Sequence, residues 1–190
     1  MYTFDYLVFI GRFQPFHLAH MQTIEIALQQ SQNVILALGS AQSERNIKNP
    51  FLASEREQMI LSNFSEQDQK RIYFVHVVDV YNDEKWVKQV KDLVNAVIQP
   101  NAKVGLIGHF KDESSYYLRL FPEWQMVELD SLKDSISATP MREAYYRGKI
   151  QTEFFPEGTI QFLSEFQNSA IYQQLQQKFK HNDRSNIDES

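Results

Sequence analysis

The chain has no cysteine and only six glycines among its 190 residues. Without cysteine, disulfide scaffolds, thiolate zinc sites and cysteine nucleophiles are excluded. No pair of glycines is spaced to form G-x-x-x-x-G-K-[ST] or G-x-G-x-x-G. A P-loop kinase or GTPase and a standard dinucleotide-binding turn are therefore disfavoured. If this chain handles nucleotides, it binds them by another arrangement.

Long apolar runs and an excess of basic charge are also absent. No run approaches the ~18 apolar residues of a membrane span, and the N-terminus carries Asp5 without a basic lead-in, so no membrane partner or signal peptide is expected. Lys and Arg number 19 against 24 Asp and Glu, which disfavours non-specific nucleic-acid binding. We expect a cytoplasmic protein. Its hydrophobic fraction of 43% is enough for the core of one domain.

Strand and helix signals alternate along the chain. Short apolar runs predict buried strands at residues 6–10, 33–38, 72–78, 104–107 and 126–129. Helical spacing predicts helices at residues 20–30, from a capping box at 54–57, at 84–98, at 114–121 and at 139–148, with Thr139 as N-cap. This order predicts an α/β fold, a Rossmann-like doubly wound parallel sheet of about five strands, with ligands at the carboxyl ends of the strands.

The composition changes after Gly148. We expect residues 1–150 to form the α/β domain, residues 151–180 to form helices packed on the same domain, and residues 181–190 to be a disordered tail. The C-terminal part is therefore a small helical extension of one domain.

The segment GRFQPFHLAH, residues 11–20, joins the first predicted strand to the first helix. His17 and His20 lie three residues apart, so both can face one side of the helix start, where free backbone N–H groups and the helix dipole favour an anion. Arg12 adds a permanent positive charge. The alternative is that the histidines only cap or pack the turn. Zinc binding is disfavoured, because two histidines without a third ligand make an incomplete site.

A second candidate anion site lies in ISATPMR, residues 136–142. Ser137 and Thr139 supply hydroxyls at a helix N-terminus, and Arg142 follows one turn later. Alone, the pattern is more typical of a capped helix with a solvated arginine. Together with the first segment it favours a second phosphate pocket.

These segments resemble a known superfamily. Residues 11–20 resemble the signature of the HxGH nucleotidylyltransferases as seen in nicotinamide mononucleotide adenylyltransferases, with Ala19 where glycine is usual, and residues 136–142 resemble the ISxTxxR element. GSAQ…NPF…ER, residues 39–56, is similar to the archaeal-type enzymes, with Lys48 where that group usually has arginine. Residues 79–86 are similar to the segment that binds the nicotinamide nucleotide. Residues 108–117, GHFKDESSYY, are similar to the bacterial branch often fused to a Nudix hydrolase.

The resemblance implies an enzyme that converts ATP and nicotinamide mononucleotide into NAD and pyrophosphate, with Mg²⁺ carried by ATP and no metal site in the protein itself. It assigns catalysis to His17, His20 and Arg142, ATP binding to Gly11, Arg12, Phe13, Lys48, Gly108, His109, Ser137 and Thr139, and mononucleotide binding to Asp79, Asn82 and Trp86. Taken without the resemblance, Trp86 is more typical of a half-buried helix tryptophan. Relatives are often homo-oligomers, and we expect the same here.

Two alternatives stay open. One is another HxGH-type enzyme, such as a pantetheine-phosphate adenylyltransferase or a cytidylyltransferase. The other is a non-catalytic nucleotide-sensing domain with the same fold. No Nudix domain is expected, because the remaining chain is too short and lacks the glycine–glutamate–arginine–glutamate box. The chain is thus either a single-function member or a truncated one.

Overall fold

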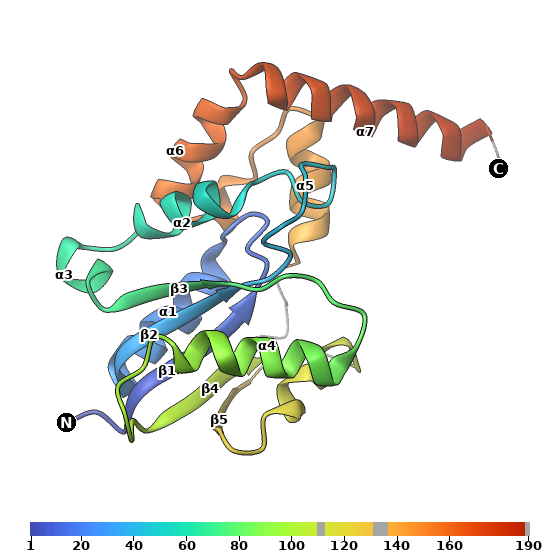
Figure 1. The fold of residues 1–190 in the computed structure, drawn as a ribbon. Coiled ribbons are helices and arrows are strands. Elements are labelled where there is room, and N and C mark those ends of the chain that lie inside the picture. Colours follow the sequence, from blue (N-terminus) through green and yellow to red (C-terminus); the bar gives the residue numbers. More distant parts are fainter. Residues whose placement is uncertain (110–112, 131–136, 189–190) are drawn as a thin grey trace.

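The computed structural model describes residues 1–109, 113–130 and 137–188. A five-stranded parallel sheet forms its centre, in the order β3-β2-β1-β4-β5 (Figure 1). The strands are β1 Phe4–Gly11, β2 Ser31–Leu38, β3 Ile72–His76, β4 Val104–His109 and β5 Gln125–Leu129. The predicted doubly wound α/β fold is confirmed.

Helices cover both faces of the sheet. They are α1 Leu18–Gln30, α2 Ala53–Leu61, α3 Glu66–Gln69, α4 Asp83–Asn95, α5 Ala138–Tyr146, α6 Glu157–Phe166 and α7 Ala170–Asp188, with 3-10 turns η1 Glu113–Leu120 and η2 Thr152–Phe154. Alternate residues of β1 serve the two faces. Leu7 and Phe9 join the core shared with α1, α2 and α5–α7, whereas Val8 and Ile10 join the core shared with α4 and η1.

Several boundaries differ from the sequence prediction. The N-cap of α5 is Ser137, two residues before the expected Thr139. Near α2, the Glu55 carboxylate accepts from the backbone N–H of Leu52 at 2.8 Å, so the capping interaction falls two residues before the expected box. The segment predicted as a helix at 114–121 is the 3-10 turn η1. Helix α7 continues to Asp188, whereas we expected a disordered tail from residue 181.

The order in which strands are added to the sheet reverses between β1 and β4, although all five strands are parallel. From β1 the chain moves to β2 and β3 on one side, and β4 and β5 lie on the other. Ligands of open α/β sheets bind beside the carboxyl ends of strands at such a switch point. The switch point therefore lies beside the carboxyl ends of β1 and β4, at Gly11 and His109.

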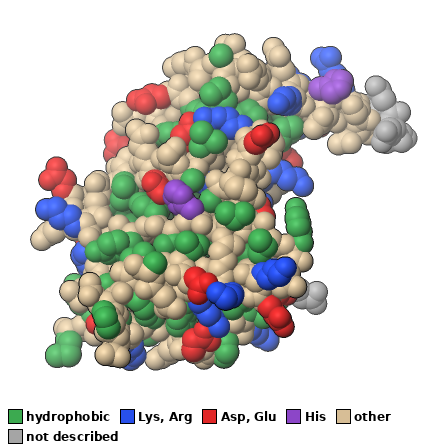
Figure 2. All heavy atoms as spheres, viewed as in Figure 1, with side chains coloured by type: hydrophobic (Ala, Val, Ile, Leu, Met, Phe, Trp, Pro, Cys, Tyr) green, Lys and Arg blue, Asp and Glu red, His purple; other side chains and the backbone are tan. Residues whose placement is uncertain are grey.

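The surface agrees with the weak net charge. On the face shown in Figure 2, acidic and basic side chains are interspersed, and no broad basic area is visible. No helix within the described ranges is both long and apolar enough to cross a membrane.

Candidate functional site

The two histidines meet at the start of α1. His17 is the N-cap, and its backbone N–H donates to Nδ1 of His20 at 3.2 Å. Because Nδ1 accepts this bond, the proton of a neutral His20 ring lies on Nε2. The rings stack with centroids 3.6 Å apart and planes 15° apart.

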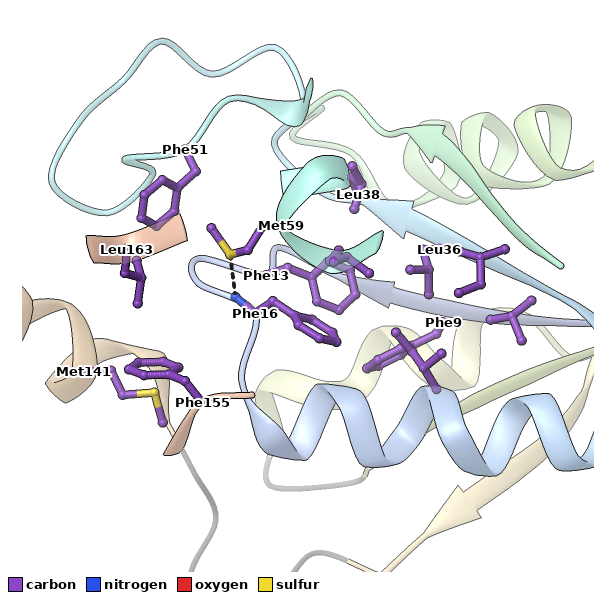
Figure 3. Close-up of a cluster of buried hydrophobic side chains, with 14 of the residues drawn as sticks. Phe9, Phe13, Phe16, Leu36, Leu38, Phe51, Met59, Met141, Phe155 and Leu163 are labelled. Atoms are coloured by element: carbon purple, nitrogen blue, oxygen red, sulfur yellow. Dashed lines mark hydrogen bonds between the residues drawn. The ribbon is translucent and has the colours of Figure 1, made fainter. Parts of the chain in front are cut away.

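An aromatic floor holds His20 in place. Phe13 meets its ring edge-on at 4.8 Å, and Phe16 stacks against it at 5.8 Å. Figure 3 shows Phe13 and Phe16 among the buried side chains beneath the loop, with Phe16 N–H directed at the sulfur of Met59. Phe13 has φ 53 and is 2% exposed. Its side chain, expected to bind ATP, therefore supports the site from below.

A cavity of about 230 Å³ opens at the switch point, and we call it the first cavity. It is lined by Phe9, Ile10, Gly11, His17, Ala19, His20, Thr23, Gly108, His109, Ser115, Tyr117 and Leu118. A Cβ at Gly11 would lie 2.9 Å from Cζ of Phe13, so any larger residue here would require this buried ring to shift. Four predicted site residues besides Gly11 share this cavity: His17, His20, Gly108 and His109.

His109 is held from two sides. Its Nε2 lies 3.1 Å from the hydroxyl oxygen of Thr23, and its Nδ1 lies 3.2 Å from the carbonyl oxygen of Asp130. The Thr23 hydroxyl also lies 3.0 Å from the carbonyl oxygen of Ala19. Thr23 is one turn beyond His20 on α1, so it joins the histidine helix to β4. The sequence reading missed Thr23, whose only local signal is its helical spacing from His20.

A second cavity, of about 440 Å³, is lined by several cationic side chains. Its lining comprises Arg12, Ile47, Lys48, Thr139, Arg142, Glu143, Tyr146 and Phe179. Arg142 is 9% exposed, donates to the carbonyl of Gln14 at 2.8 Å and lies 3.5 Å from the Thr139 hydroxyl. Burial, and then the nearby charge of Arg12, lower the pKa of Arg142. Positive charge collected in a partly enclosed space suits a polyphosphate.

In the two cavities formed by described residues, the histidines line the first and Arg142 lines the second. They lie on two sides of the loop at residues 11–20, with Gly11 in the first cavity and Arg12 in the second. Arg142 touches that loop through Gln14. Ser137 is exposed and is not among the lining residues, and Ile136 of the same motif lies outside the described residues.

Arg56 ties together the turns that follow β1 and β2. It is 1% exposed and donates to the carbonyls of Arg12 at 2.9 Å, Gly39 at 2.8 Å and Ser40 at 3.4 Å. Burial, then the charge of Arg12, lower the pKa of Arg56 to about 10. Ser40 and Phe13, in the two turns, have positive φ. A buried guanidinium on these carbonyls therefore stabilises backbone that is costly to hold.

The residues predicted to bind the mononucleotide make structural contacts of their own. Asp79 accepts from the Ser40 hydroxyl at 3.0 Å, and Asn82 caps α4 through the N–H of Lys85 at 3.0 Å. Trp86 is half-buried, edge-on to Tyr117 at 5.8 Å. None of the predicted three lines either cavity. Tyr117, which Trp86 meets edge-on, does line the first cavity.

Neither cavity is built as a metal cage. Within residues 1–109, 113–130 and 137–188, no group of three or more His, Cys, Asp or Glu side chains is placed to hold a metal ion. Glu143 stands among Arg12, Lys48 and Arg142 in the second cavity. One carboxylate among three cationic side chains is not enough to hold a metal ion, so this lining suits a phosphate group that carries its own cation.

Comparison with known proteins agrees with this geometry. A family model of cytidylyltransferase-like proteins matches residues 8–144. The chain is 74% identical to a nicotinamide/nicotinic acid mononucleotide adenylyltransferase of Acinetobacter baylyi, over 98% of this chain and 100% of that protein. It is 30% identical to a nicotinamide-nucleotide adenylyltransferase of Thermococcus onnurineus, over 83% of this chain and 81% of that one.

A solved structure shows the same fold. A bifunctional NMN adenylyltransferase/ADP ribose pyrophosphatase from Francisella tularensis, complexed with AMP and a manganese ion, superimposes with a TM-score of 0.85 at 35% identity. The match covers 94% of this chain and 53% of that one, so this chain spans about half the length of that bifunctional protein. The chain belongs to the cytidylyltransferase-like family. Within that family it is similar to the mononucleotide adenylyltransferases named above.

Proposed function

We propose that this chain is an adenylyltransferase that joins the AMP part of ATP to nicotinamide mononucleotide, giving NAD and pyrophosphate. The observation that carries the proposal is the contact between Arg142 and Gln14. It brings the cation-rich second cavity against the loop that presents His17 and His20 to the first. Relatives at 74% and 30% identity are named for this kind of activity.

The two cavities bind different parts of the ATP molecule. Phe9, Ile10 and Leu118 give the first cavity apolar walls that suit the adenosine part. Arg12 and Arg142 in the second cavity face the β- and γ-phosphates, which leave as pyrophosphate. The histidines lie on the loop between the cavities, where the α-phosphorus is attacked.

The reaction needs positioning and charge stabilisation more than proton transfer. The 5′-phosphate of the mononucleotide is largely dianionic near neutral pH, since its second pKa is ~6. It attacks the α-phosphorus in line while the bond to the pyrophosphate oxygen breaks. Nε2–H of His20 donates to an α-phosphate oxygen, and the guanidinium of Arg142 binds the departing group. Lys48 and Arg12 neutralise the charge that accumulates there.

Mg²⁺ enters with ATP. Bound to the phosphate oxygens, it neutralises part of their charge. The protein's role is to receive this complex: the guanidinium groups bind the remaining oxygens, and Thr139 contributes a hydroxyl close to Arg142. We further propose that the enzyme acts in the cytoplasm as a homo-oligomer.

Incubation of the purified chain with ATP, Mg²⁺ and nicotinamide mononucleotide tests the proposal. NAD and pyrophosphate should appear in equal amounts. Nicotinic acid mononucleotide, phosphopantetheine and CTP in the same assay determine the preferred acceptor and donor. Calorimetric binding of ATP without release of pyrophosphate would instead support the nucleotide-sensing alternative.

A further inference from the structure

One hydrogen bond joins the two sides of the second cavity. The hydroxyl of Tyr146 donates to the carbonyl of Ile47 at 2.7 Å, across 99 residues of sequence. Ile47 precedes Lys48, and Tyr146 follows Arg142 by one turn of α5. All four residues line this cavity. The bond therefore connects the backbone beside one cation to the helix that carries the other.

Lys48 needs such an anchor. It lies in the segment between β2 and α2, residues 39–52, which contains no strand or helix. Asn46 orders the local turn by accepting from the N–H of Lys48 at 2.9 Å. That bond is internal to the segment, so it does not fix the distance to α5. The bond from Tyr146 joins the segment directly to α5, and α5 is packed against the rest of the protein through Tyr145 and Met141, which are 4% and 3% exposed.

Helix α7 holds Tyr146 in place. The ring of Phe179 lies 5.2 Å from the ring of Tyr146 and itself lines the second cavity. The side-chain amide of Gln176 donates to the carbonyl of Tyr146 at 2.9 Å. Figure 1 shows α7 running over the end of α5 and out beyond the body of the protein. This helix lies outside residues 8–144, which match the family model.

We propose that Tyr146 is a positioning residue for the phosphate-binding cavity: it sets the distance between Lys48 and Arg142, and α7 keeps it there through Phe179 and Gln176. The inference rests on the proposed function, because it takes the second cavity as the place of the β- and γ-phosphates. It gives the C-terminal helix a role in substrate binding. Tyr146 acts through Lys48 and touches no reacting atom.

The test is Tyr146→Phe, which keeps the ring on Phe179 and removes the donor. We expect the dissociation constant of inorganic pyrophosphate, measured by calorimetry, and the KM for ATP to rise about tenfold, the scale of one lost hydrogen bond. The KM for the mononucleotide should change less than about twofold. The matched control is Tyr172→Phe, which removes an α7–α5 bond of 2.6 Å, to the carbonyl of Tyr145, away from the cavity.

A double-mutant cycle separates positioning from general loosening. In a Lys48→Met background, Tyr146→Phe should weaken pyrophosphate binding no further, because the residue through which it acts is gone. Additive effects would overturn the proposal, and so would an equal loss of pyrophosphate binding in Tyr172→Phe. Phe179→Leu is the second variant should Tyr146→Phe unfold: it should weaken pyrophosphate binding severalfold, and unchanged binding would count against α7.

The binding measurement also keeps the two proposals distinguishable. A chain that forms no NAD but binds pyrophosphate in a Tyr146-dependent way would refute the proposed function and support the positioning role. If the chain forms NAD but Tyr146→Phe leaves the pyrophosphate affinity unaltered, the proposed function is supported and the positioning role of Tyr146 is refuted.

Discussion

Nη1 of Arg142 donates a 2.8 Å hydrogen bond to the carbonyl oxygen of Gln14, 128 residues earlier in the chain. The α5 guanidinium is thereby held against the loop between β1 and α1, which leads into His17 and His20 at the start of α1. A guanidinium has five N–H donors in a planar fork. Arg142 can therefore hold Gln14 and still present donors to the second cavity, so that one side chain both joins the two motifs and lines the site.

Replacement of Arg142 by lysine tests whether positive charge alone is enough, or whether the side chain must also bond Gln14 and a phosphate at the same time. Lysine keeps the positive charge but cannot reach Gln14 and a phosphate together. We expect kcat/KM for ATP to fall by about 100-fold in steady-state assays. Arg71→Lys is the control, because Arg71 also donates to backbone carbonyls, those of Leu28 at 2.5 Å and Ser31 at 2.8 Å, at the opposite end of the sheet. It should lower stability and leave the kinetics unchanged; a similar kinetic loss in both variants would contradict the role of Arg142.

His20 variants test the hydrogen-bond assignment on its ring. His20→Ala should lower kcat by at least about 100-fold, because it removes a donor to the transition state. His20→Asn offers an oxygen near the position of Nδ1 and can still accept from His17 N–H, so its thermal stability should stay close to that of the parent. Its kcat should fall as in the alanine variant. Near-normal turnover of His20→Asn would show that Nε2–H is not the donor, and His76→Ala, exposed and paired with Glu57, serves as the control.

The two tryptophans allow a matched test of mononucleotide binding. Trp86→Ala should raise the KM for the mononucleotide more than the KM for ATP, since an indole favours a cationic ring by about 1–2 kcal/mol where desolvated. Trp124→Ala removes a neighbour in the same apolar cluster, stacked on Phe121 at 4.9 Å. It should change stability but neither KM. Equal rises of both KM values in Trp86→Ala would mean that Trp86 only packs against Tyr117 and Phe121.

Alkaline pH should destabilise the fold. Burial raises the pKa of Tyr145 and Tyr146 well above the usual 10, so the unfolded chain releases protons that the folded chain keeps. The stability that these two tyrosines contribute is complete below their unfolded pKa and is lost as the pH rises from that value toward their folded pKa. The lowered pKa values of Arg56, at about 10, and of Arg142 act in the opposite sense, but more groups have a raised pKa, since burial also raises the pKa of Tyr117 and Tyr172. The urea midpoint should therefore fall between about pH 9 and pH 11, and more gently in Tyr145→Phe; an equal slope in that variant would refute the assignment.

Much of the fold could be predicted because its signals are local. The apolar runs at 6–10 and 33–38 lie inside β1 and β2, and the polar segments after them do gather at one edge of the sheet. The existence of a buried strand follows from an apolar run of a few residues, although β3 ends at His76, two residues before the predicted end. Helix limits were less accurate, as with the N-cap of α5 at Ser137 and the continuation of α7 to Asp188, because several neighbouring residues can cap or extend a helix.

The amino-acid sequence alone determined the order of strands and helices along the chain and the segment that carries His17 and His20, since both depend on residues close together in the chain. Only the tertiary structure decided that Arg142 holds Gln14, that Arg56 joins two turns, and that Tyr146 reaches Ile47. The bonds from Arg142 to Gln14, from Tyr146 to Ile47 and from Arg56 to Arg12 join residues 128, 99 and 44 positions apart. Their partners become neighbours only when the sheet and the C-terminal helices have packed, and no local pattern specifies that distance.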